Sequence, residues 1–123
     1  MTTRAIIYDT NTSTTTNTSP LIIIPGLRVT GLTQSVVERV NTYTALTTDD
    51  IVLCNNATSM TVILPVASAT GHILQIKNIN NVGSVTVDAN VGGGKIDDEL
   101  TQEVASYENL TIVDGLALKW YIL

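Results

Sequence analysis

Side chains suited to nucleophilic or metal chemistry are scarce in this chain, which has one histidine, His72, and one cysteine, Cys54. Zinc sites take three or four protein ligands, so these two residues cannot supply a set of nitrogen and sulfur ligands within one chain. Two arrangements stay open: a Cys–His nucleophile pair, and a ring of His72 side chains around a three-fold axis. Cys54 ends an apolar run, however, and is expected to be a small buried residue. We therefore predict no catalytic residue and no metal site.

Two further segments resemble ligand-binding loops only superficially. Gly92–Lys95 reads GGGK, but a Walker phosphate loop needs glycine where Ala89 stands and serine or threonine where Ile96 stands. We predict a tight turn with positive φ instead, and no cofactor. The acidic cluster Asp97–Glu99 lacks the spacing of a calcium loop, and the few aromatic residues of the chain provide little material for a sugar cleft. A solvated turn is the prediction there.

Charge and composition argue against several classes of protein. Six Lys and Arg against eleven Asp and Glu give a net charge of −5, the wrong sign for gripping nucleic-acid phosphates. No apolar run approaches the roughly 20 residues of a membrane span, and no signal-peptide core is recognisable. A single cysteine cannot form an internal disulfide. We expect neither nucleic-acid binding, nor membrane insertion, nor secretion.

The composition predicts an all-β protein with an aliphatic core. Among 123 residues there are 20 Thr, 13 Ile and 13 Val, but no Phe. These β-branched residues lose rotamer freedom in helices and pack well on pleated sheets. Short apolar runs separated by turn residues indicate a small sandwich with jelly-roll-like topology. The predicted strands are Ile51–Cys54, Met60–Leu64, His72–Ile79, Ser84–Asp88, Asn109–Asp114 and Leu118–Leu123, with a hairpin turn at Asp114-Gly115.

The first third of the chain differs from the rest. A polar run from Thr10 to Ser19 separates two apolar segments, and such a run buries too little surface to order itself. We interpret residues 1–42 as an extended arm and residues 43–123 as the β domain; the alternative is a tail whose two edge strands pack on its own domain. Gln34–Val40 fits a helical turn or a strand. The anchoring residues of the arm are predicted to be Arg4, Ile6, Ile7, Tyr8, Leu21, Ile22, Ile23 and Ile24.

The β domain resembles a small domain that recurs in tailed-phage virion proteins, in fibres, tail tips and capsid-surface proteins. The resemblance runs from Tyr43 to Leu123. Members commonly have glycine where Asp98 stands, so that turn is expected to differ. The resemblance implies a homotrimer with a structural or receptor-contacting role, located in the virion, and no active site. Its landmarks are Asp49–Leu53, Thr61–Pro65, Gly71–Lys77, Val85–Val87, Gly94–Asp97, Leu110–Gly115 and Trp120–Leu123.

Three functions follow as hypotheses. The first is a capsid decoration (cement) or head-fibre protein, anchored by its arm to the major capsid protein or another virion protein through strand addition. The second is a tail-fibre tip or receptor-binding adhesin that contacts host glycans through loops at one end, with Asn80, Asn81, Gly93 and Tyr107 as candidates. The third is an enzyme such as a glycan depolymerase, for which the sequence supplies no acid–base pair.

Overall fold

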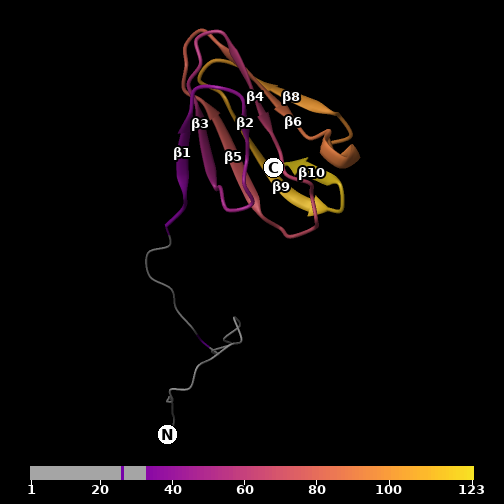
Figure 1. The fold of residues 1–123 in the computed structure, drawn as a ribbon. Coiled ribbons are helices and arrows are strands. Elements are labelled where there is room, and N and C mark those ends of the chain that lie inside the picture. Colours follow the sequence, from indigo (N-terminus) through magenta and orange to yellow (C-terminus); the bar gives the residue numbers. More distant parts are fainter. Residues whose placement is uncertain (1–25, 27–32) are drawn as a thin grey trace, which may run out of the picture. The chain divides into compact units, whose positions relative to one another are not determined.

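The structure is a computed structural model that describes Gly26 and residues 33–123, and its strands form two sheets packed together (Figure 1). The predicted all-β sandwich is confirmed. A single turn of 3₁₀ helix, η1 (Val91–Gly93), follows β6. The six-stranded sheet has the order β1 (Val36–Arg39), β3 (Ile51–Cys54), β5 (Ile73–Asn78), β9 (Asn109–Leu116), β10 (Lys119–Ile122) and β7 (Lys95–Ile96). The four-stranded sheet has the order β2 (Tyr43–Thr44), β4 (Ser59–Ile63), β6 (Ser84–Asp88) and β8 (Thr101–Val104).

The strand connections differ from those of a jelly roll. Successive strands from β1 to β6 alternate between the sheets, so that β1, β3 and β5 pair in parallel, as do β2, β4 and β6. Each pair of strands thus makes one turn of a short parallel solenoid, in which every turn packs on its neighbours. The antiparallel strands β8, β9 and β10 then close the sandwich. A jelly roll is antiparallel throughout, so the expected jelly-roll-like topology is not what the chain adopts.

The core is aliphatic because alternate residues of each strand face the opposite sheet. In β6, Val85 and Val87 are buried while Ser84, Thr86 and Asp88 lie outward, as the alternation of this segment predicts. Trp120 is the one large aromatic side chain of the buried cluster. The largest fully buried side chains are Trp120, Leu64, Leu74, Ile76, Ile96, Ile112, Val52, Val62, Val85, Val87, Val104 and Asn78.

The folded unit begins ten residues before the predicted boundary at residue 43. It comprises Thr33–Leu123, because Gln34–Val40, which fitted helix or strand, contains β1, and β1 pairs with β3. At this first turn of the solenoid the Arg39 guanidinium lies 4.4 Å from the centre of the Tyr43 ring. This distance is that of a cation–π contact, and the Tyr43 ring packs against the core. The eight predicted anchoring residues, from Arg4 to Ile24, lie outside the described residues.

The predicted hairpin at Asp114-Gly115 is wrong. Asp114 pairs with Trp120 and Leu116 with Lys119, so β9 continues through Gly115, which is the extra residue of a bulge. A Cβ atom on Gly115 would lie only 2.6 Å from the Tyr121 ring, which explains the glycine. Three strands were not predicted: β2, β7 and β8. Two of them have two residues each, and β8 is polar except for its last residue.

Candidate functional site

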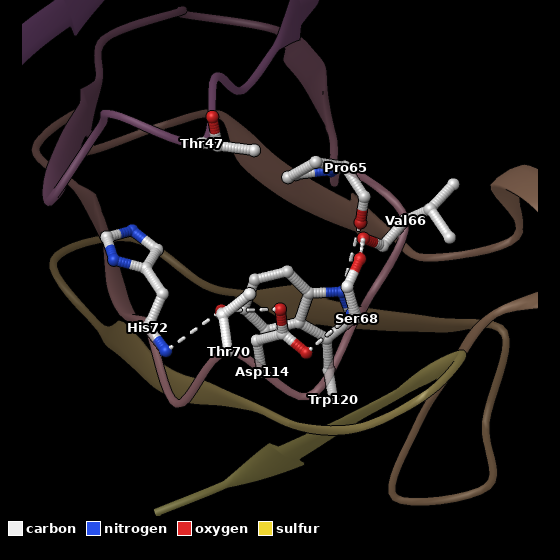
Figure 2. Close-up of a pocket in the computed structure, with 8 residues that line it drawn as sticks. All are labelled: Thr47, Pro65, Val66, Ser68, Thr70, His72, Asp114 and Trp120. Atoms are coloured by element: carbon white, nitrogen blue, oxygen red, sulfur yellow. Dashed lines mark hydrogen bonds between the residues drawn. The ribbon is translucent and has the colours of Figure 1, made fainter. Parts of the chain in front are cut away.

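A pocket of ≈ 190 Å³ opens at the end of the sandwich where β4 ends and β5 begins (Figure 2). Its lining comes from four separate parts of the chain: the β2–β3 loop, the β4–β5 loop, β9 and β10. The Trp120 indole forms part of its wall and donates through Nε1 to the Pro65 carbonyl at 3.2 Å. The lining residues are Thr47, Pro65, Val66, Ser68, Thr70, His72, Asp114 and Trp120.

Asp114 organises the β4–β5 loop at the edge of this pocket. Its side chain is buried and accepts three hydrogen bonds: from the backbone N–H groups of Ser68 and Ala69, both at 2.8 Å, and from the Thr70 hydroxyl at 2.7 Å. Burial raises the pKa of this carboxyl, but the bonds from Thr70, Ser68 and Ala69 outweigh that effect and lower the pKa below its usual value. Asp114 therefore stays ionised and tethers the loop to β9.

The pocket contains a serine, a histidine and an aspartate, but they do not form a catalytic triad. The His72 ring bonds through Nε2 to the Asp49 carbonyl oxygen at 2.6 Å, and the Asp114 carboxylate bonds to the loop rather than to His72. The Ser68 hydroxyl donates to the Val66 carbonyl at 3.2 Å. Nucleophilic catalysis needs a serine bonded to a base that a third group orients. The hydrogen bonds in this pocket instead hold the loop in place.

Exposed apolar side chains lie on the segments that adjoin the pocket. Leu46 precedes Thr47 in the chain, and the Leu118 amide donates to the Ala67 carbonyl at 2.9 Å. A Cβ atom on Gly92 would lie 3.4 Å from Val66, which places η1 beside the pocket. We call the pocket and this rim the apolar end. The rim residues and their exposed fractions are Leu46 55%, Val66 43%, Val91 44%, Leu116 56% and Leu118 41%.

The opposite end of the sandwich carries three of the four predicted receptor-facing residues. Asn80 and Asn81 lie in the β5–β6 loop and Tyr107 in the β8–β9 loop. The two loops are neighbours, because the backbone N–H of Asn78, at the end of β5, donates to the Glu108 carbonyl at 3.0 Å. Gly93 does not belong to this group, because it lies in η1 at the apolar end. The prediction that the four gather at one end is therefore wrong for Gly93.

We call the end formed by the β5–β6 and β8–β9 loops the asparagine-rich end. Its side chains differ in whether they are free to contact a ligand. Asn80 is used internally: its Oδ1 accepts from the Val82 and Gly83 amides, and its Nδ2 donates to Asn55 at 2.9 Å. Asn81 is exposed. Tyr107 is 60% exposed and has a φ of 64°, which bulky residues rarely adopt. Lys77 donates from Nζ to the Tyr107 carbonyl and so helps to hold this conformation.

The remaining candidates have structural surroundings. Cys54 is fully buried in the core, as predicted, and burial raises the pKa of its thiol to about 11. Gly92 and Gly93 have φ values of 65° and 85°, which confirms the predicted turn. Asp97 and Asp98 form an exposed two-residue turn between Ile96 and Glu99, and the φ of 70° at Asp98 is one that glycine favours. The prediction of a solvated turn holds.

The described part of the chain holds neither a cluster of metal-ligating side chains nor a membrane-spanning helix. Within residues 33–123 and Gly26, no three His, Cys, Asp or Glu side chains lie close enough together to hold a metal ion. In the same part of the chain, no helix is long and apolar enough to cross a membrane. The acidic turn and His72 are therefore not assembled into a common cluster.

The outer faces of the two sheets differ in character. On the six-stranded sheet, the residues facing away from the core form connected rows: Val36 lies opposite Ile51, and Ile73 opposite Val113, which lies opposite Tyr121. On the four-stranded sheet the corresponding residues are mostly hydroxyl-bearing or acidic. We call the apolar residues of the first face the apolar outer face: Val36, Ile51, Leu53, Ile73, Val113, Tyr121 and Leu123. Polar residues interrupt it, namely Glu38, Gln75, Lys77, Asn109, Thr111 and Lys119. The polar outer face comprises Thr44, Ser59, Thr61, Ser84, Thr86, Asp88, Thr101 and Glu103, with Ile63 as the apolar exception.

Comparisons of the chain with protein-family models, with curated proteins and with solved structures found no match.

Proposed function

We propose that the chain is a structural, non-enzymatic protein of a bacteriophage virion: a homotrimeric capsid decoration or head-fibre protein attached through its N-terminal arm. The resemblance of residues 43–123 to virion domains supports the virion role. The observation that carries the structural, self-associating part of the proposal is the contrast between the two outer sheet faces.

The apolar outer face is unusual for a sheet that meets water. A half-buried sheet places apolar residues inside and polar residues outside, as the four-stranded sheet does. In the six-stranded sheet, Val36 is 55% exposed, Ile73 44% and Leu123 67%. Two uncharged residues lie between Ile51 and Leu123 across the sheet. Gln75 pairs with Ile51 on one side and with Thr111 on the other, and the Leu123 amide donates to the Thr111 carbonyl. Exposed apolar residues grouped on one face of a sheet mark an interaction site, and in the proposal the other copies of the chain cover them.

Matched substitutions on the two faces test this arrangement. Ile73→Glu places a charge on the apolar face, and Thr86→Glu places the same charge on the polar face, on a strand of the other sheet. Both side chains point away from the core, so both variants are expected to fold. Ile73→Glu is expected to reduce the solution mass from three chains to one, whereas Thr86→Glu keeps three. Equal masses for the two variants would contradict the assignment of the face.

Cross-linking on purified virions tests the attachment. The arm, residues 1–32, contains two arginines, one aspartate and no lysine, so a photoreactive linker is required. Links from the arm to the major capsid protein are expected. Links only to tail or baseplate proteins would contradict the decoration role. Deletion of residues 1–32 is expected to abolish attachment and to leave a folded trimer, because the compact unit begins at Thr33.

The adhesin hypothesis is a second candidate that one observation favours. Tyr107 holds an exposed ring at the tip of a loop in a conformation that costs about 1–2 kcal/mol for a residue other than glycine. Exposed tyrosines are common anchors in binding surfaces. Binding of the chain to host polysaccharide that Tyr107→Ser removes would support this function, and a null result across hosts would count against it.

A further inference from the structure

The apolar end joins a pocket to exposed apolar side chains on the adjoining segments, and the proposed function gives it no role. The five rim residues, Leu46, Val66, Val91, Leu116 and Leu118, are each more than 40% exposed. They come from four separate segments and meet only in the folded unit. An exposed apolar patch around a pocket is typical of a protein–protein contact in which one side chain enters the pocket.

The chemistry of the pocket selects an apolar occupant. Three of the polar groups of its walls are already paired: Asp114 with the loop, the Trp120 N–H with the Pro65 carbonyl, and His72 Nε2 with the Asp49 carbonyl. Thr47 is exposed at the mouth, where water can satisfy its hydroxyl. A sugar would bring several hydroxyl groups into a pocket where these three groups are already bonded, which disfavours it. An aromatic or branched aliphatic group makes no such demand.

The size of the pocket indicates one ring. Its volume of ≈ 190 Å³ lies below the roughly 300–1,000 Å³ of small-molecule sites. An apolar cavity of about 150 Å³ is enough to bind benzene. The pocket therefore accommodates a single aromatic side chain, with the Trp120 indole as a wall (Figure 2).

The position of the chain's first described segment indicates where the partner lies. The Ser35 hydroxyl donates to the Thr48 carbonyl at 2.9 Å and accepts from the Asp50 amide at 2.9 Å, so the folded unit begins beside Thr47, at the apolar end. The 32 residues that precede this unit include the proposed anchor. A protein held by the arm is thus tethered to the end that bears the pocket.

We propose that the apolar end is a docking surface for the protein that the arm binds, and that the pocket receives one aromatic side chain of that protein. The inference rests on the proposed attachment through the arm, and it orients the folded unit. The apolar end faces the partner, and the asparagine-rich end with Tyr107 faces away from it.

Ligand titration of the full chain tests the pocket without any virion. Trp120 is the only tryptophan, so its indole N–H gives a single resolved signal in a proton–nitrogen NMR spectrum. Toluene is expected to shift this signal saturably in the millimolar range, and methyl glucoside, which carries a polar six-membered ring, is expected to leave it unchanged. No response to toluene, or a saturable response to the sugar, would overturn the proposal.

Rebinding of the full chain to virions that lack it tests the docking. Leu46→Asp and Val66→Asp place a charge on the rim, and Val82→Asp places it at the opposite end on a residue that is 71% exposed. The rim variants are expected to bind virions at least about tenfold more weakly than the unchanged chain, and Val82→Asp is expected to bind as tightly as the unchanged chain. Equal binding by all three would overturn the docking role. Failure of the unchanged chain to bind any virion would refute the proposed attachment and, with it, this partner, while the toluene titration still decides whether the pocket binds an apolar ring.

Discussion

Replacing Asp114 with alanine is expected to be among the most costly single changes in the folded unit. The carboxylate accepts hydrogen bonds at 2.8, 2.8 and 2.7 Å from three donors of one loop, and it is only 5% exposed. Each hydrogen bond to a charged group contributes about 1.5–3 kcal/mol, and each buried donor left without a partner costs about 1–3 kcal/mol. Because the loop can relax and admit water, we expect a loss of about 4 kcal/mol in the free energy of unfolding.

Asp114→Asn separates hydrogen bonding from charge. The amide oxygen still accepts from the Ser68 and Ala69 amides, and the Thr70 hydroxyl can rotate to accept from the amide nitrogen. We expect about half of the alanine effect, roughly 2 kcal/mol. Asp98→Asn is the matched control, because asparagine tolerates the φ of 70° at this position and the Asp98 side chain is 83% exposed and forms only a 3.9 Å ion pair with Lys119. This control is expected to change stability by less than about 0.5 kcal/mol.

Urea unfolding followed by Trp120 fluorescence, at one fixed protein concentration, measures all three variants. The reasoning would be refuted if the free energy of unfolding of Asp114→Ala lay within about 1 kcal/mol of that of the unchanged chain. This margin is the lower end of the cost of leaving one buried donor without a partner. Acid adds an independent test. Because the pKa of Asp114 is lower in the folded chain, its stabilising effect is complete above the unfolded pKa near 3.8 and is lost as the pH falls through the folded value. Asp114→Asn should lack this component of acid sensitivity.

Three further predictions concern other residues. Gly83→Ala is expected to lower the free energy of unfolding by at least about 3 kcal/mol, because its Cβ atom would lie 1.9 Å from the Asn56 carbonyl oxygen. Gly93→Ala has open space around it and should lower the free energy of unfolding by only about 1 kcal/mol. Similar thermal midpoints for the two variants would contradict the close contact between Gly83 and the Asn56 backbone. Tyr107→Asn is expected to raise stability by about 0.5–1 kcal/mol, since asparagine tolerates positive φ, and a loss of stability in urea would show that the ring makes a folded-state contact. Cys54 is expected to resist thiol reagents in the folded chain and to react on unfolding, and rapid native labelling would contradict its burial.

Local patterns were sufficient to predict several strands and turns, but not how the strands pair. The alternation in Ser84–Asp88 identifies β6, and the glycines at 92 and 93 identify a turn, because both signals depend on neighbouring residues. The parallel pairing of β3 with β5 is not visible locally, since it depends on chain crossing to the other sheet and back. Asp114-Gly115 shows the opposite failure: its strong turn signal marks a bulge, because the glycine makes room for Tyr121.

The pocket could not be predicted from the sequence for the same reason. The sequence singles out His72 by its residue type and Trp120 as part of a landmark of the resemblance. The pocket that they share forms only when the fold brings Thr47, Pro65 and Asp114 beside them. A signal for Asp114 was present, since an acidic residue within an otherwise apolar strand needs donors nearby. The sequence alone does not show that Ser68, Ala69 and Thr70 supply them.

The solution mass of the full chain tests the central claim most directly. Sedimentation equilibrium over a range of concentrations gives this mass without reference to shape. A trimer is predicted, with a mass about three times the 13.1 kDa of one chain, held together through the apolar outer face. A mass of one chain at all concentrations would contradict the account, because the apolar face of the six-stranded sheet would then be exposed to water without a partner of its own kind.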